Sequence, residues 1–99
     1  MSYRVRFAPS AADDLQRLFD FLAETDLAAA ERARDVIAKA LGFLQTFPFS
    51  CRKADPDNAF LRELVIGFGG YGYVALFEIE DTNTVTVLAV RHQREDDYY

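Results

Sequence analysis

The strongest constraint on the fold is a change in hydrophobic periodicity near residue 60. Before it, apolar residues recur every three or four positions from Ala11 to Leu44, which predicts two consecutive amphipathic helices. After it, β-branched and aromatic residues dominate the segments 60–66, 71–80 and 85–91, which predicts strands. The connections between these strands are only a few residues long, so we expect the strands to pair as an antiparallel meander.

A further strand is predicted at the N-terminus, where Tyr3, Val5 and Phe7 alternate with charged or small residues. The predicted order is therefore β-α-α-β-β-β, an α+β fold in which a helical hairpin packs on an antiparallel sheet. A chain of 99 residues has material for one core, so residues 1–99 are expected to form a single domain.

The ends of the helices carry recognisable signals. Ser10 and Asp13 have the spacing of a capping box, and Thr25 or Asp26 can serve as the N-cap of the second helix. After that helix, the polar and turn-forming residues of segment 49–59 predict a surface loop.

Composition excludes several classes of function. The net charge of −5 argues against a protein that binds its partners mainly through phosphate contacts. Cys51 and His92 are the only residues of their types, so neither an internal disulfide nor a Cys/His zinc site can form. The acidic residues of the first helix, Asp14 among them, are interpreted as a solvated face rather than as metal ligands. We therefore expect no metal and no cofactor.

Targeting signals were also sought. The longest charge-free stretch is too short to span a membrane, and the N-terminal residues lack the apolar core of a signal peptide. A cytoplasmic protein without a membrane partner is expected.

Two basic groups are candidates for chemistry or binding. Arg62 shares a face of its strand with apolar neighbours, which suits either a side chain that pairs with a carboxylate or one that recognises an anion or a partner. Arg91, His92 and Arg94 end the last strand. They are either a solvated strand end or a proton-transfer group beside fixed positive charge, as phosphodiester cleavage requires.

A glycine-rich run at 67–74 matches the sequence pattern of a nucleotide-binding loop. It leads into a predicted strand rather than into a helix, so we interpret it as a strand connection.

The order of the elements and their residues resembles the RelE/ParE superfamily of toxins from bacterial type II toxin-antitoxin systems. The resemblance covers nearly the whole chain and rests on Tyr3-Arg4-Val5, Ala12-Asp13-Asp14-Leu15, Ala29-Ala30, Leu44, Phe47-Pro48, Leu61-Arg62-Glu63-Leu64, Tyr73-Val74, Phe77 and the segment from Val87 to His92. One departure is Cys51, which stands where the family pattern Pro-x-x-Gly-Arg after the second helix has glycine.

The resemblance implies one of two activities. RelE-like members cleave messenger RNA on the ribosome, and Arg62, Arg91, His92 and Tyr98 would then be the catalytic candidates. ParE-like members inhibit DNA gyrase through a docking surface and are not enzymes. The acidic charge and the strand-end pattern Val90-Arg91-His92-Gln93-Arg94 favour the ParE branch, so a gyrase-binding toxin that arrests growth is expected.

The alternatives are a ribosome-dependent mRNA endoribonuclease and an inactive interaction module of the same fold. Direct nucleic-acid binding is expected only if the chain acts on the ribosome.

The same resemblance implies a cognate, ParD-like antitoxin that forms a hetero-oligomer with the chain. We expect this antitoxin to lie in the groove between the helical hairpin and the sheet. The residues expected to bind partners are Arg52, Lys53, Arg62, Arg91 and Arg94.

Overall fold

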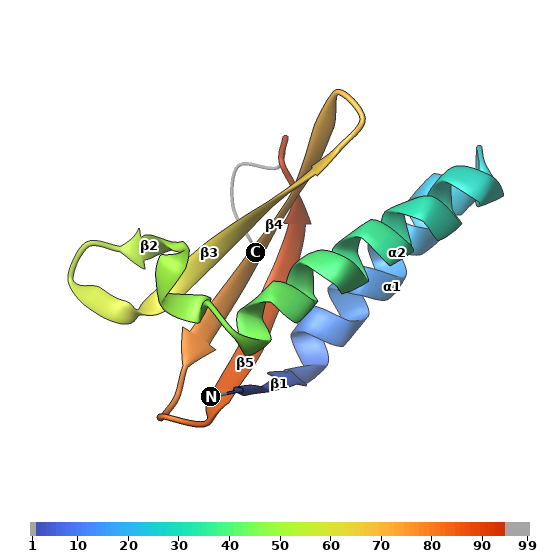
Figure 1. Ribbon diagram of the computed structural model, residues 1–99. Coiled ribbons are helices and arrows are strands. Elements are labelled where there is room, and N and C mark those ends of the chain that lie inside the picture. The colour runs from blue at the N-terminus through green and yellow to red at the C-terminus, as the bar shows by residue number, and fades with distance from the viewer. Residues whose placement is uncertain (1, 95–99) are drawn as a thin grey trace.

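The computed structural model describes residues 2–94. Its elements are β1 (Arg4–Phe7), α1 (Pro9–Ala23), α2 (Leu27–Gly42), the 3-10 turns η1 (Phe43–Gln45) and η2 (Pro48–Ser50), β2 (Arg52–Asp55), β3 (Asn58–Phe68), β4 (Tyr71–Ile79) and β5 (Thr84–His92). Within these residues the strands form a five-stranded sheet in the order β1-β5-β4-β3-β2, and the two helices cover one of its faces (Figure 1). The predicted α+β class and the helical hairpin on a sheet are confirmed.

The direction of β1 differs from the prediction. β1 runs parallel to β5, with Val5 opposite Val85 and Phe7 opposite Val87, so the sheet is mixed rather than antiparallel throughout. The alternation of residues in β1 determines which face is buried but not the direction of the strand. No short turn joins β1 to β5, and so nothing local imposes an antiparallel pairing.

The prediction of a surface loop over 49–59 was wrong, because this segment contains the edge strand β2. Arg52 lies opposite Glu63 and Lys53 opposite Arg62 in an antiparallel pairing with β3. Charged residues are depleted in strands generally, so the charged sequence of β2 did not indicate a strand. They are typical of edge strands, where charge discourages pairing with other chains.

The two helices begin differently. The predicted capping box was wrong: α1 starts at Pro9 after Ala8, and the hydroxyl of Ser10 donates 2.7 Å to the carbonyl of Leu88 on β5. For α2 the cap is confirmed, since Asp26 accepts a 3.0 Å hydrogen bond from the amide of Ala29.

Asp14 is buried, which corrects its assignment to the solvated face of α1. Its side chain is 5% exposed, and Oδ2 accepts a 2.9 Å hydrogen bond from the amide of Val90. The pairing of β5 with β1 ends at Val87, so this amide lies on a part of the edge that no strand covers. Ser10 and Asp14 thus satisfy backbone groups of β5 that would otherwise be unpaired.

The core lies between the helices and the sheet. Its fully buried side chains include Phe77 of β4, Val85, Val87 and Val90 of β5, and Leu44 of η1. Both ends of the sheet extend past this core: the β2–β3 turn projects at one end and the β3–β4 turn at the other (Figure 1). The candidate residues lie at these two ends.

Candidate functional site

The predicted site residues form two groups at opposite ends of the sheet. Arg62 on β3 lies opposite Phe77 of β4, whereas His92 on β5 lies opposite Tyr73 of β4. These positions on β4 are four residues apart, which is about 13 Å along a strand. The two side chains also start from strands on either side of β4, so they do not approach a common atom.

Arg62 is bonded to the backbone of neighbouring segments. Its Nε donates 2.7 Å to the carbonyl of Ala59, and one terminal nitrogen donates to the carbonyls of Cys51 (2.8 Å) and Phe49 (3.2 Å). The guanidinium carbon also lies 5.4 Å from the centre of the Phe49 ring. The side chain therefore holds η2 and the start of β2 against β3.

Arg91 lies on the other face of the sheet. It is opposite Val74, whereas Arg62 is opposite Phe77, and these two β4 residues point to opposite faces because side chains alternate along a strand. A terminal nitrogen of Arg91 donates 3.3 Å to the carbonyl of His92. The two arginines thus cannot grip one phosphate together.

His92 belongs to an aromatic cluster at the end of β5. Its ring centre lies 4.5 Å from that of Tyr71 and 5.8 Å from that of Tyr73, and its Nδ1 accepts a 3.1 Å hydrogen bond from the amide of Arg94. The guanidinium of Arg94 lies 5.8 Å from the Tyr71 ring centre. Burial raises the pKa of the Tyr73 hydroxyl, and Tyr71 raises it further, so Tyr73 is a poor proton acceptor at neutral pH. The catalytic candidate Tyr98 lies outside the described residues.

The remaining basic candidates are on β2. Arg52 is exposed, and its Nε lies 3.0 Å from a carboxylate oxygen of Glu63. Lys53 is exposed as well. Beside them Cys51 is buried, and this burial raises the pKa of its thiol more than the charge of Arg62 lowers it. The thiol is therefore neutral and poorly reactive at pH 7.

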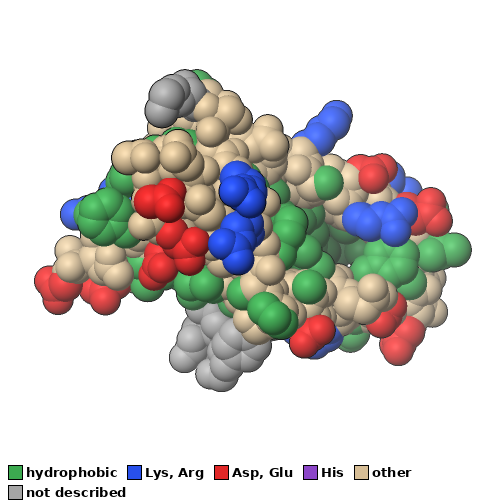
Figure 2. Space-filling view, turned by 90° about the horizontal axis from the view of Figure 1, so that it is seen from below, with side chains coloured by type: hydrophobic (Ala, Val, Ile, Leu, Met, Phe, Trp, Pro, Cys, Tyr) green, Lys and Arg blue, Asp and Glu red, His purple; other side chains and the backbone are tan. Residues whose placement is uncertain are grey.

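A hollow of about 380 Å³ lies along the helical hairpin. It is lined mainly by apolar side chains of α1 and α2, with one residue each from β1 and β4, namely Phe7, Ala12, Leu15, Gln16, Leu18, Phe19, Ala30, Ala33, Arg34, Ile37, Ala38, Leu41 and Tyr73. Figure 2 shows hydrophobic side chains gathered in a hollow on the part of the molecule that carries the helices. The charged residue in this lining is Arg34, whose guanidinium lies 5.0 Å from the centre of the Phe19 ring.

Within residues 2–94, no group of three or more His, Cys, Asp or Glu side chains is arranged to hold a metal ion. No helix in the same range has the length and apolar character needed to cross a membrane. The arrangement found is one of binding surfaces: an apolar hollow with one arginine, and an aromatic and basic strand end.

This fold is shared with solved toxins. The chain is similar to a structure described as the chromosomal ParDE toxin-antitoxin system from P. aeruginosa, with a TM-score of 0.73, 18% identity, and coverage of 96% of this chain and 98% of that one. It is also similar to a structure of the RelBE2 toxin-antitoxin complex from Mycobacterium tuberculosis, with a TM-score of 0.63, 29% identity, and coverage of 93% and 99%. The protein is therefore a RelE/ParE superfamily toxin.

Sequence comparison identifies the family. A family model described as the ParE toxin of the type II toxin-antitoxin system, parDE, matches residues 5–97, and the chain belongs to this family. The protein named Toxin RelE3 of Caulobacter vibrioides is 32% identical over 92 residues, which cover 92% of this chain and 95% of that protein.

Proposed function

We propose that the protein inhibits DNA gyrase by binding to it and that a cognate antitoxin neutralises it. The observation that carries the proposal is the separation of the candidates for RNA cleavage. Arg62 is bonded to three backbone carbonyls at one end of the sheet. His92 lies at the other end, and Arg91 on the opposite face from Arg62. A nuclease centre needs a proton-transfer group within hydrogen-bonding reach of the reacting atoms and fixed positive charge around the same phosphate.

The charge of the chain supports the same proposal. With 11 Lys and Arg against 16 Asp and Glu, the protein is repelled by nucleic acid at long range. Binding to a protein target carries no such penalty. The proposed action needs a docking surface and no cofactor.

The antitoxin is proposed to occupy the hollow along α1 and α2. This hollow is apolar apart from Arg34 and Gln16, so it suits an amphipathic segment with a carboxylate placed to reach Arg34. Arg91 and Arg94 at the end of β5, and Arg52 and Lys53 on β2, are proposed as further contacts for acidic side chains. Arg62 would act indirectly, since it positions η2.

One alternative is favoured by a specific observation. The 32% identity with Toxin RelE3 and the likeness to the RelBE2 complex fit a RelE-like endoribonuclease that acts on the ribosome. In that case His92 is the candidate for proton transfer, with Arg94 and Tyr71 beside it. An inactive interaction module of the same fold is the third possibility.

The test begins with growth. Induction without the antitoxin should arrest growth, and co-expression of the neighbouring antitoxin should restore it. Purified toxin should inhibit supercoiling by purified gyrase, while primer extension on translated mRNA should show no cuts.

The variant His92→Gln separates the two activities. It should retain gyrase inhibition within about threefold, because the proposed inhibitor uses no proton transfer, whereas a general acid or base contributes about 100-fold or more to a nuclease. Cut transcripts that disappear in this variant would replace the gyrase proposal with the nuclease. Unimpaired growth on induction would favour the inactive module.

A further inference from the structure

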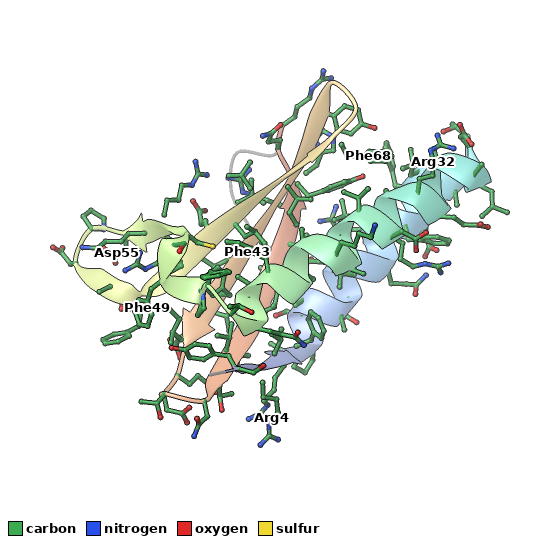
Figure 3. The ribbon with its side chains drawn as sticks, viewed as in Figure 1. Arg4, Arg32, Phe43, Phe49, Asp55 and Phe68 are labelled. Carbon is green, nitrogen blue, oxygen red and sulfur yellow. The ribbon has the colours of Figure 1, made fainter. Side chains whose placement is uncertain are left out.

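A second hollow, of about 640 Å³, lies at the end of the molecule away from the helical hairpin. It is bordered by η2, the β2–β3 turn and the β4–β5 turn, and its lining consists of Tyr3, Phe49, Asn58, Phe60, Glu78, Ile79, Glu80, Asp81 and Thr82. Figure 3 shows Phe49 and Asp55 at this end, whereas Phe68 lies near the β3–β4 turn at the other.

Phe49 and Phe60 form the apolar part of this hollow. The two rings meet edge to face with their centres 6.1 Å apart, yet the side chains remain 47% and 54% exposed. Phe43 and Phe47 form a separate pair outside this lining, with ring centres 5.4 Å apart and exposures of 43% and 53%. Exposed aromatic side chains packed on one another, such as Phe49 and Phe60, are a common mark of a protein interaction site.

The rest of the hollow is acidic. Glu78 is near the end of β4, and Glu80 directly follows this strand. Asp81 lies in the turn to β5, where its Oδ1 accepts a 2.7 Å hydrogen bond from the amide of Asn83. Among residues 2–94, no ion pair is found for Glu78 or Glu80. Figure 2 shows acidic side chains on both sides of hydrophobic ones at this end of the molecule.

Arg62 of β3 lies beside the hollow, but its guanidinium donates to the carbonyls of Ala59, Cys51 and Phe49. The next basic strand is β1. Arg6 lies opposite Thr86, which in turn lies opposite Glu78, so Arg6 and Glu78 are separated by β5. Two strand spacings are about 10 Å, comparable to the distance over which physiological salt screens charges. The carboxylates of the hollow are therefore available to a ligand.

We propose that this hollow binds a basic segment of a protein partner. An apolar or aromatic side chain of the segment would pack on Phe49 and Phe60. Glu78 alternates with Phe77 and therefore points to the other face of the sheet from Phe60, so the segment would pass over the end of the sheet for its Lys or Arg side chains to contact Glu78 and Glu80. Arg62 already places its guanidinium 5.4 Å from the centre of the Phe49 ring, so a cation packs against one member of this aromatic pair.

Charge distinguishes this occupant from others. Phosphate groups of a nucleic acid would be repelled by the carboxylates. A second copy of the chain, paired symmetrically through the same hollow, would bring two acidic rims together. The surface lies at the other end of the fold from the proposed antitoxin hollow, so both can be occupied at once, and the inference does not depend on gyrase inhibition.

Binding is tested with the full chain and a short synthetic peptide that has one tryptophan flanked by lysines. Amide shifts at low salt should change at the β2–β3 and β4–β5 turns. The double variant Glu78→Gln with Glu80→Gln should weaken binding about tenfold, the effect of losing two surface ion pairs. The variant Phe60→Ser should also weaken it, and a peptide with glutamates in place of lysines should not bind.

The matched controls lie on exposed positions elsewhere. Glu31→Gln with Asp35→Asn removes the same charge from α2, and Phe21→Ser removes an aromatic ring that is 73% exposed. Both should leave the affinity for the peptide unchanged. The proposal is overturned if these controls weaken binding as much as the hollow variants do, or if amide shifts fall on α1 and α2. It is also overturned if light scattering shows a dimer that Phe60→Ser abolishes.

Discussion

The two ends of the sheet use arginine in opposite ways. At the β2 end, the guanidinium of Arg62 donates to the carbonyls of Ala59, Cys51 and Phe49. At the β5 end, Arg94 is exposed, and its guanidinium lies 5.8 Å from the centre of the Tyr71 ring. The first side chain connects segments of the protein, and the second lies on its surface.

This difference bears on function. A guanidinium bonded to three carbonyls would have to leave them before it could bind a phosphate, and each charge-assisted hydrogen bond lost contributes to the cost. Arg94 faces no such requirement. We propose that partners contact the β5 end and that Arg62 supports the structure, and the following predictions test that division.

The largest effect is expected at the β5 end, for Gly72→Ala. A Cβ at this position would overlap the backbone carbonyl of Ile66, and no flexible side chain is there to move aside. Overpacking against backbone should lower the free energy of unfolding by about 3 kcal/mol, measured by urea denaturation. The control is Gly67→Ala, because a Cβ there meets nothing within 4 Å. Equal stability of the two variants would show that the strands are not held closely at this end.

The next largest effect is expected for Arg62→Ala. Removing the guanidinium leaves the carbonyls of three residues without this donor, so the free energy of unfolding should fall by about 2 kcal/mol. Arg52→Ala is the matched control. Arg52 is 57% exposed although its partner Glu63 is only 15% exposed, so the loss should be smaller than for Arg62→Ala, about 1 kcal/mol. If both variants lose the same stability, Arg62 has no special structural role.

A smaller, pH-dependent effect is expected at Cys51. Burial raises the pKa of this thiol in the folded protein above the pKa of the same thiol in the unfolded chain. The contribution of the thiol to the free energy of unfolding is therefore fully present below the unfolded-state pKa and is lost as the pH rises through the folded-state pKa. Stability should decline as the pH rises above about 8.5, the usual value for a free thiol. Urea unfolding at about pH 7 and about pH 9.5 should show a larger loss for the natural protein than for Cys51→Ala. Parallel losses would contradict the assignment to Cys51.

The smallest effect on stability is expected for Arg94→Ala. An exposed arginine at a strand end should change the free energy of unfolding by less than about 0.5 kcal/mol. If Arg94 meets an acidic side chain of the antitoxin, calorimetry should show binding weakened about tenfold. Loss of stability comparable to that of Arg62→Ala would remove the distinction between the two ends.

Much of the fold was predictable from the residues. Helix periodicity, the N-cap at Asp26 and four of the five strands are local properties, and the structure confirms each. Asp14 was misassigned although it lies three residues after Ala11 and four before Leu18, both buried, so the apolar stripe itself held the signal. β2 was missed because its charged residues resemble a loop until a partner strand is known.

The candidate site was harder to predict. The residue types at positions 62, 91, 92 and 94 indicated binding or phosphate chemistry, but a strand pattern does not state which distant strand lies alongside. The aromatic hollow was missed for a related reason. Phe49 lies in η2 and Phe60 in β3, two elements that no local pattern relates to each other. Only folding brings their ring centres to within 6.1 Å.

The sequence by itself determined the order of the two helices and of four strands, the apolar stripe of the helices, and the acidic charge, since these depend on spacing and composition. Only the tertiary structure decided that β1 runs parallel to β5, that Arg62 donates hydrogen bonds to backbone carbonyls, and that His92 lies far from Arg62. Such facts depend on strand register and on the alternation of faces. Turn geometry can set the register of strands joined by a short turn. No such turn joins β1 to β5, so their pairing depends on the packing of residues remote in sequence.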